Sequence, residues 1–543
     1  MVFARRSTTL LAAIIASCAM VLSLTACTSD NKTVVDGQTT VTSNSAGGVA
    51  VFTPSDGITL NQQMPLNKWA KLVPDLTKAL VDAGFKKGDI NHTTSDSLAK
   101  QSRAIQDFVV DHLSNNTTDD SGIAIAPDNM TLLVAPVVEA DASTRQYGDY
   151  VSQNLSTNDV TDEGATSDGE SSEDDSSKDD SSNTESDSTA SDEQAQAVDR
   201  LVSSLKLAKE SGMHVVLLGN SIEGYKPDAF VKFSDAQTIG KLQAEKMVSK
   251  LKLDKASKDN PKYIEVLLPY TAVDEKGNAN DSTFAQEAFR GIWQVLGSYY
   301  QKGVVESPSG TLDGKSTEND WQAVAYDAAK EGSTAKVLDK RLAKTDGQST
   351  LTRIDGIITM NDYIASEVVK ELDDLGYTGS AADINPQITI SGIVGNITGK
   401  KDLSRDAVPD PIKSPENDNA NDSSSSDDDA DEDTSASDKD RDSQWPLVTG
   451  YGAYVSNIPS IVNGKQWMTG MEDRQTIATD IAQACAKLNK DEALNSMPSI
   501  RNSEVGGVKK IPTISEPLLA VSASNLKSAL IDPGYISLAD AGL

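Results

Sequence analysis

Short apolar runs alternate with longer stretches of helical periodicity along most of the chain. The runs are four to eight residues long and end at tight-turn residues, which is typical of buried strands. The stretches between them carry apolar residues at helical spacing, and several end at glycine. Strand and helix in alternation predict an α/β protein with parallel sheets. Strands are predicted at 48–52, 131–138, 214–218, 263–268, 354–360, 387–394 and 446–449.

The best-defined unit is 445–473. It reads as a short strand closed by Gly450, a helix, and a second short strand, which together form a βαβ unit. In an open α/β sheet, the loop after the first strand lies at the ligand crevice, so we expect 450–453 to line a binding site. The runs 387–394 and 446–449 are both candidates for this sheet position, and the pattern favours 446–449.

The N-terminus is typical of an exported protein. Arg5 and Arg6 precede an apolar run at 10–24, which ends in Leu-Thr-Ala-Cys at Cys27. A run this short with a basic flank indicates a secretory signal rather than a spanning helix. The ending resembles a bacterial lipobox and predicts lipidation of Cys27, which would anchor the chain to the membrane. The alternative is an ordinary signal peptide with an incidental cysteine.

The cysteines and histidines predict neither an internal disulfide nor a metal site. Cys18 lies in the predicted signal and Cys27 would carry lipid, so Cys485 alone remains in the mature body and no internal disulfide is possible. The three histidines show no metal-ligand spacing. We therefore expect no metal or cofactor, and a fold held by its apolar cores.

The net charge of −32 is concentrated in two segments. Residues 157–193 and 416–442 together hold 26 acidic and 3 basic residues and almost no apolar ones. Such segments have nothing to bury and are predicted to be disordered surface insertions. Solvated spacers are favoured over calcium binding, because no Gly-containing ligand loop is present. The acidity argues against nucleic acid as a partner. The remaining chain, roughly 400 residues, suits two lobes.

The order of the motifs resembles the type I periplasmic sugar-binding proteins, the xylose and multiple-sugar branch served by ABC transporters. The resemblance is diffuse and spans 48–535. It implies a periplasmic binding protein-like I fold, with two doubly wound parallel-sheet lobes joined by a three-segment hinge. The motifs that carry it are Lys68-Trp69, Asp235, Asn361-Asp362, Thr449-Gly450-Tyr451-Gly452-Ala453, Gly464-Lys465-Gln466, Thr469 and Asp473.

The resemblance also implies a set of ligand contacts. Alternatives stay open for four of them. Trp69 stacks on a sugar or belongs to the core, and Asn220 binds a hydroxyl or forms a turn. Asp235 binds ligand, caps a helix, or does both, and Asp362 accepts sugar hydroxyls or caps a helix. The family's Gln and Asp are replaced by Tyr451 and Gly452, and its Arg is lost near Asn220, so a different ligand is expected. The predicted ligand contacts are Trp69, Asn220, Asp235, Asn361, Asp362 and Tyr451.

The implied function is an extracytoplasmic solute-binding lipoprotein, not an enzyme, that captures a small polar ligand, a monosaccharide, for an ABC importer. Its partners would be the sugar, the permease subunits and, through lipid, the outer face of the cell membrane; it would act as a monomer. The rival hypothesis is a surface signalling or adhesion lipoprotein that keeps the fold and has lost sugar binding.

The chain is predicted to divide into five parts. These are a signal at 1–27, a disordered linker at 28–46, a first lobe at 47–255 plus 474–500, a second lobe at 256–473 with its insertion at 414–443, and a hinge-spanning segment at 501–543.

Overall fold

The computed structural model describes most of the chain. It covers the backbone of 33–35 and 38–40, and residues 46–55, 65–115, 125–138, 146–151, 153–156, 185–273, 279–328, 330–343, 351–382 and 444–542. The chain divides into two compact units, Met1–Asn44 and Ser45–Leu543. In the first unit, β1 (Thr33–Val35) and β2 (Gln38–Thr40) form an antiparallel pair within the predicted linker. All that follows concerns the second unit.

The first lobe is built on a seven-stranded sheet. Its strands are β3 (Gly48–Pro54), β4 (Ile90–Ser95), β5 (Met130–Val134), β7 (His214–Leu218), β9 (Ala229–Lys232), β17 (Ile500–Val505) and β18 (Val508–Ser515). Their order is β17-β18-β9-β7-β5-β3-β4, and every pair is parallel except β17 with β18. The direction of winding reverses between β3 and β5, which is the pattern of a doubly wound sheet.

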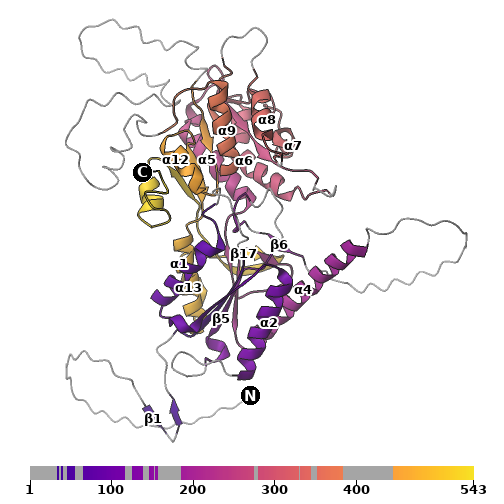
Figure 1. The fold of residues 1–543 in the computed structure, drawn as a ribbon, viewed down its shortest axis with the longest axis vertical. Coiled ribbons are helices and arrows are strands. Elements are labelled where there is room, and N and C mark those ends of the chain that lie inside the picture. The colour runs from indigo at the N-terminus through magenta and orange to yellow at the C-terminus, as the bar shows by residue number, and fades with distance from the viewer. Residues whose placement is uncertain are drawn as a thin grey trace, which may run out of the picture. The chain divides into compact units, whose positions relative to one another are not determined.

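Alternating side chains of β3 lie in two separate cores. Val49 and Val51 join the core under α1 (Trp69–Asp82) and α13 (Arg474–Leu488). Ala50 and Phe52 join the core under α2 (Leu98–Asn115) and α4 (Glu185–Glu210) on the opposite face. Figure 1 shows the two helix pairs on either side of the sheet. A strand buried on both faces explains its uninterrupted apolar sequence.

The second lobe has a smaller, wholly parallel sheet. Its strands are β10 (Lys262–Val266), β12 (Val305–Glu306), β14 (Gly356–Ile358) and β15 (Leu447–Thr449), in the order β12-β10-β14-β15. The helices of this lobe are α5 (Ala236–Lys250), α6 (Thr283–Gln301), α7 (Trp321–Val324), α8 (Ser333–Arg341), α9 (Asp362–Leu375) and α12 (Ile458–Val462). Because β15 pairs with β14, the run 446–449 takes the predicted sheet position; 387–394 lies outside the described residues.

Three segments connect the lobes, as expected. They join β9 to α5, β16 (Met468–Met471) to α13, and β18 to β19 (Leu519–Ser522), and β16 pairs with β19 in antiparallel fashion. Two doubly wound sheets with three connections confirm the predicted fold class.

The predicted lobe boundaries need two corrections. The first is that α5 belongs to the second lobe, so the lobe begins before residue 256. Its residues Ile239, Ala244 and Met247 lie in the second-lobe core. Two glycines allow α5 to lie directly against α6: a Cβ on Gly240 would lie 2.2 Å from the Ala288 carbonyl oxygen, and one on Gly291 would lie 2.0 Å from that of Gln237.

The second correction concerns 501–543. Most of β17 and all of β18 fall in this range and extend the first-lobe sheet, since β18 continues it in parallel from β9. Only the residues after β18 return to the hinge strands. There Leu526, Leu530 and Tyr535 pack with Ile458 and Ile461 of α12 in a small separate core.

Two further expectations concern the insertions and the membrane. Helix α4 begins at Glu185, inside the segment predicted as disordered. Residues 157–184 and 414–443 lie outside the described residues. Within the described parts of the chain, no helix has the length and apolarity needed to cross a membrane.

The contact between α5 and α6 yields a prediction. Gly291→Ala should lower the free energy of unfolding by about 2 kcal/mol or more, because overpacking against a backbone carbonyl outweighs the helical preference of alanine. Gly314→Ala is the control, since its nearest neighbour would lie 3.5 Å away. Chemical denaturation measures both. A neutral or stabilising Gly291→Ala would contradict the close approach.

Candidate functional site

The predicted ligand residues lie where the strands of the two sheets end. Asn220 follows β7 and Asp235 follows β9 in the first lobe; Tyr451 follows β15 in the second. Asn361 and Asp362 follow β14. In doubly wound sheets this carboxyl edge is where ligands bind. The sixth residue, Trp69, is the first residue of α1. Five of the six predicted residues therefore follow the carboxyl end of a strand.

A short segment that the sequence analysis passed over, Gln146–Val151, contacts both lobes at this edge. Tyr147 and Val151 belong to the second-lobe core, whereas Tyr150 belongs to a first-lobe core. Gly148 between them has φ +95°, and a Cβ there would lie 2.6 Å from the carbonyl oxygen of Asn67. Glycine is thus required for the segment to pass this close to the start of α1.

On the first-lobe side, the segment packs on Trp69. The ring of Tyr150 lies 5.1 Å from that of Trp69, edge to face, and stacks on Phe233 at 4.8 Å. The Tyr150 hydroxyl donates to the Lys68 carbonyl at 2.5 Å. The Asp149 carboxylate accepts from the Trp69 backbone N–H at 3.1 Å and from Lys68 Nζ at 2.7 Å. This carboxylate satisfies the otherwise open N-terminus of α1.

On the second-lobe side, the contacts come from Gln146 and Tyr147. Asn361 Nδ2 donates to Gln146 Oε1 at 3.0 Å, and the Tyr454 hydroxyl donates to the Gln146 carbonyl at 2.6 Å. The Tyr147 ring lies 4.7 Å from Phe284 and 6.3 Å from Tyr451. Asn361 also caps α9, because its Oδ1 accepts from the Ile364 N–H at 2.9 Å.

Asn220 binds the continuation of the same segment. Its Oδ1 accepts from the Gln153 N–H at 3.0 Å, and its Nδ2 donates to the Pro136 carbonyl at 2.9 Å. Beyond Gln153, β6 (Asn154–Leu155) pairs with β8 (Ser221–Ile222). Both polar groups of the Asn220 amide are engaged by backbone of the first lobe.

The Tyr451 side chain forms hydrogen bonds at the hinge. Its hydroxyl lies 2.5 Å from Ser234 Oγ in the first crossing segment and donates to Glu472 Oε1 in the second, at 3.4 Å. The same Glu472 oxygen accepts from the Ser234 N–H at 2.5 Å. Burial raises the pKa of Glu472 from its ordinary 4.5 to about 7. Tyr451 thus joins two of the three connections.

Asp362 organises the strand ends of the second lobe. It is fully buried, and its carboxylate accepts from Gln466 Nε2 at 2.7 Å, the Tyr454 N–H at 2.9 Å and Thr469 Oγ1 at 2.9 Å. Burial raises its pKa to about 6 against the effect of these donors. A Cβ on Gly450 would lie 2.1 Å from Asp362 Oδ1, so glycine is needed beside this carboxylate.

Asp235 and Trp445 have structural contacts. Asp235 is the N-cap of α5, where it accepts from the Thr238 N–H at 2.7 Å, and it pairs with Lys232 at 2.8 Å. Trp445, at the start of the predicted 445–473 unit, is fully buried and donates from Nε1 to the Lys465 carbonyl. The helix-cap interpretation of Asp235 is confirmed.

Two non-glycine residues beside the segment adopt left-handed backbone conformations. Met360, just before Asn361, has φ +67°, and Ala453, just before Tyr454, has φ +50°. Such conformations cost energy in residues with a Cβ and concentrate at sites where the geometry matters. Both residues precede a side chain that contacts Gln146, so the strain fits a role in positioning these two contacts.

The structure thus brings four of the six predicted residues onto one segment. Trp69, Asn361 and Tyr451 contact residues of 146–151, and Asn220 contacts Gln153. The side-chain hydrogen bonds described above for Asp235 and Asp362 go to other residues. That these residues contact a solute stays a prediction, and Cys27 lies outside the described residues. The missed signal was a pair of tyrosines in a chain that is only 5% aromatic.

Other polar features lie apart from this site. A groove of about 610 Å³ on the first lobe lies between α1, α13 and Pro533-Gly534, and no predicted ligand residue lines it. Among the residues that the structure describes, no group of three His, Cys, Asp or Glu side chains could hold a metal ion.

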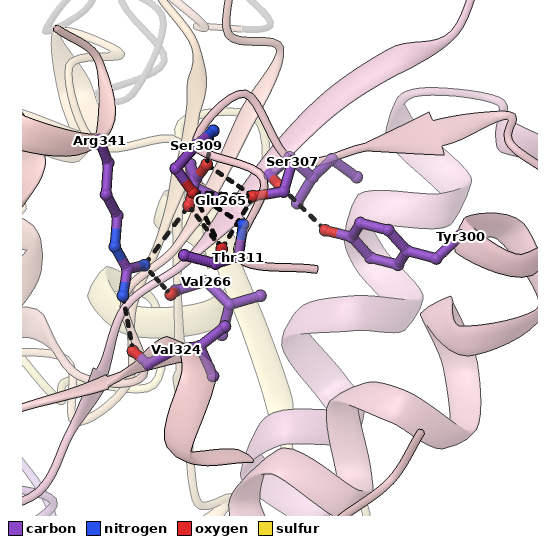
Figure 2. A network of polar contacts seen from close by, with 9 residues as sticks. Glu265, Val266, Tyr300, Ser307, Ser309, Thr311, Val324 and Arg341 are labelled. Carbon is purple, nitrogen blue, oxygen red and sulfur yellow. Dashed lines mark hydrogen bonds and ion pairs between the residues drawn. The ribbon is translucent and has the colours of Figure 1, made fainter. Parts of the chain in front are cut away.

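A buried carboxylate in the second lobe is fully engaged by protein groups (Figure 2). Glu265 of β10 accepts from Ser307 Oγ at 2.7 Å and the Ser309 N–H at 2.8 Å, and pairs with Arg341 at 3.4 Å. Arg341 also donates to the Val324 carbonyl at 2.9 Å. This network ties α8 to the sheet and leaves no open position, which indicates a structural role.

Comparison with known proteins finds similar solved structures only. No family model and no curated protein sequence matches the chain. It is similar to an ABC transporter solute-binding protein from Clostridium phytofermentans with bound β-D-glucose (17% identity, 91% of this chain, 99% of that chain, TM-score 0.44). Two others are a carbohydrate transporter solute-binding protein from Chloroflexus aurantiacus in complex with D-glucose (18%, 92%, 98%, 0.43) and a periplasmic ribose ABC transporter protein from Conexibacter woesei (13%, 90%, 96%, 0.42).

Glu472 predicts a pH dependence of stability. An acid whose pKa is raised by folding stabilises the fold at low pH, and this contribution is lost as the pH rises from about 4.5 through about 7. Over that range the free energy of unfolding should fall by about 3 kcal/mol more in the natural protein than in Glu472→Gln.

Denaturant titrations at a series of pH values measure this difference. Glu492→Gln, at an exposed ion pair with Lys487, is the control and should keep the natural pH dependence. Parallel curves for the natural protein and Glu472→Gln would show that Glu472 does not titrate in this range.

Arg341 offers a second stability test. Arg341→Met should cost about 3–5 kcal/mol, because it leaves Glu265 buried without its cation. Arg290→Met removes an exposed pair with Glu287 and should cost less than about 1 kcal/mol. Thermal and denaturant unfolding compare the two. Equal losses would mean that the buried pair is not a stabilising contact.

Proposed function

We propose that this protein is an extracytoplasmic solute-binding protein that takes up a small polar ligand of the monosaccharide class between its two lobes. The observation that carries the proposal is the convergence of Trp69, Asn220, Asn361 and Tyr451 on one place. These residues come from both lobes, and each follows a strand end or begins a helix. A ligand held there would couple its binding to a hinge motion of the three connections.

The side chains at this place suit a sugar. Trp69 and Phe233 offer aromatic surface, and carbohydrate rings pack well on such surfaces. Asn361 and Asn220 carry amides, which can donate to and accept from hydroxyl groups. Asn361 already presents its Nδ2 to an amide oxygen of Gln146, and a sugar hydroxyl would be an equivalent acceptor.

We further propose that the protein acts at the outer face of the cell membrane, held by lipid on Cys27, and delivers its ligand to the permease of an ABC importer. The support is the N-terminal sequence, with its basic flank, apolar run and terminal cysteine. A monomer that binds and releases its solute without chemistry fits this role.

The proposal is tested by calorimetric titration of the purified protein with a panel of pentoses and hexoses. We expect saturable binding of at least one sugar. Asn361→Asp should weaken it at least about tenfold, because the variant keeps the acceptor that caps α9 and loses the donor. The control, Asp473→Asn, makes the reverse exchange of carboxylate for amide at the N-cap of α13. It should change the affinity less than about twofold.

Two outcomes would contradict the proposal. Failure of every sugar to bind would leave the two lobes as a scaffold for a surface signalling or adhesion role. Equal affinities for Asn361→Asp and the natural protein would place the sugar elsewhere.

A further inference from the structure

We propose that Gln146–Val151 is a built-in occupant of the solute site, which holds the lobes together and must be displaced before a solute can bind. The inference deepens the proposed function and rests on it. It concerns a regulatory contact at the same site, made by the chain itself.

The first argument is the identity of the contacting residues. The four residues that converge here were selected as ligand contacts from the sequence, without reference to this segment. Three of them now meet a group of Gln146–Val151: an aromatic ring on Trp69, an amide oxygen on Asn361 and a ring on Tyr451. Asn220 accepts from the backbone N–H of Gln153, just beyond the segment. Aromatic stacking with amide hydrogen bonding is also how a sugar would be bound. The segment and a solute therefore compete for the Asn361 amide and the Tyr451 ring of the second lobe.

The second argument is the unequal attachment to the two lobes. The first lobe holds the segment through the Asp149 carboxylate, the Asp149 N–H to the Asn67 carbonyl at 2.8 Å, the Tyr150 hydroxyl and the β6–β8 pairing. The second lobe holds the segment mainly through the buried Tyr147 ring and two hydrogen bonds of Gln146. When the lobes separate, the segment will therefore stay with the first lobe, and Tyr147 will leave the second.

The third argument is that Tyr147, on a segment attached to the first lobe, is buried in the second-lobe core. The Tyr147 side chain is 1% exposed, and its neighbours Phe284 and Tyr451 belong to the second lobe. A ring buried this deeply resists withdrawal, because its apolar surface would return to water. The apparent affinity for a solute is then reduced in proportion to the small fraction of molecules whose segment is withdrawn.

The test combines two variants with two measurements on the full chain. Tyr147→Ala removes the ring that enters the second lobe. Gln146→Ala removes the side-chain acceptor of Asn361 and needs no large cavity, so it serves if the first variant folds poorly. Tyr299→Ala is the matched control, a partly exposed tyrosine that contacts Asp254 and not the segment.

The first measurement is amide hydrogen exchange without sugar. Exchange at 361–365 and 451–454 should be at least about tenfold faster in both variants than in the natural protein and in Tyr299→Ala. Unchanged exchange in both variants would overturn the inference, whether or not a sugar binds.

The second measurement is calorimetry with the sugar panel. Both variants should bind the preferred sugar at least about tenfold more tightly than the natural protein. Weaker or equal binding in both would overturn the inference. If exchange accelerates and no sugar binds to any variant, the proposed function is overturned, while the role of the segment in closing the lobes is supported.

Discussion

Polar groups at the strand ends must find partners when two parallel sheets face each other, and this constraint shapes the centre of the molecule. An unpaired buried donor or acceptor costs a large part of the free energy that folding leaves. Here the demand is met by the protein itself. Asp362 gathers three donors from three parts of the second lobe, and Glu472 joins Ser234 to Tyr451 across the hinge. Gln146–Val151 adds partners for Asn361 and Tyr454 at the second-lobe strand ends.

Much of the scaffold was predictable because its signals are local. The strands are uninterrupted apolar runs, since β3, β5 and β7 are buried on both faces. Helix starts were marked by Asp235 and a helix end by Gly376, which has φ +94° at the end of α9. These residues act through their own backbone neighbourhood, so their effect can be inferred without knowledge of distant contacts.

The wrong lobe assignments concern segments whose position depends on tertiary packing. Helix α5 lies in the second lobe because two glycines permit close contact with α6, and neither glycine reveals its partner in the sequence. The β17–β18 hairpin carried a local signal, Gly506-Gly507 between two apolar residues, which is typical of a tight hairpin turn. The family resemblance led instead to a hinge assignment for 501–543. The role of 146–151 was hidden for a different reason, because two tyrosines and a glycine form no motif until both lobes surround them.

The covalent attachment of Gln146–Val151 has a quantitative consequence. A tethered group competes at an effective concentration fixed by the chain, commonly in the millimolar range for short flexible connections, and dilution of the protein cannot lower it. A free solute would therefore have to exceed a threshold set by the protein rather than by its surroundings. A solute-binding protein of this design would respond to abundant solute and not to traces, and changes in two tyrosine side chains would be enough to move that threshold.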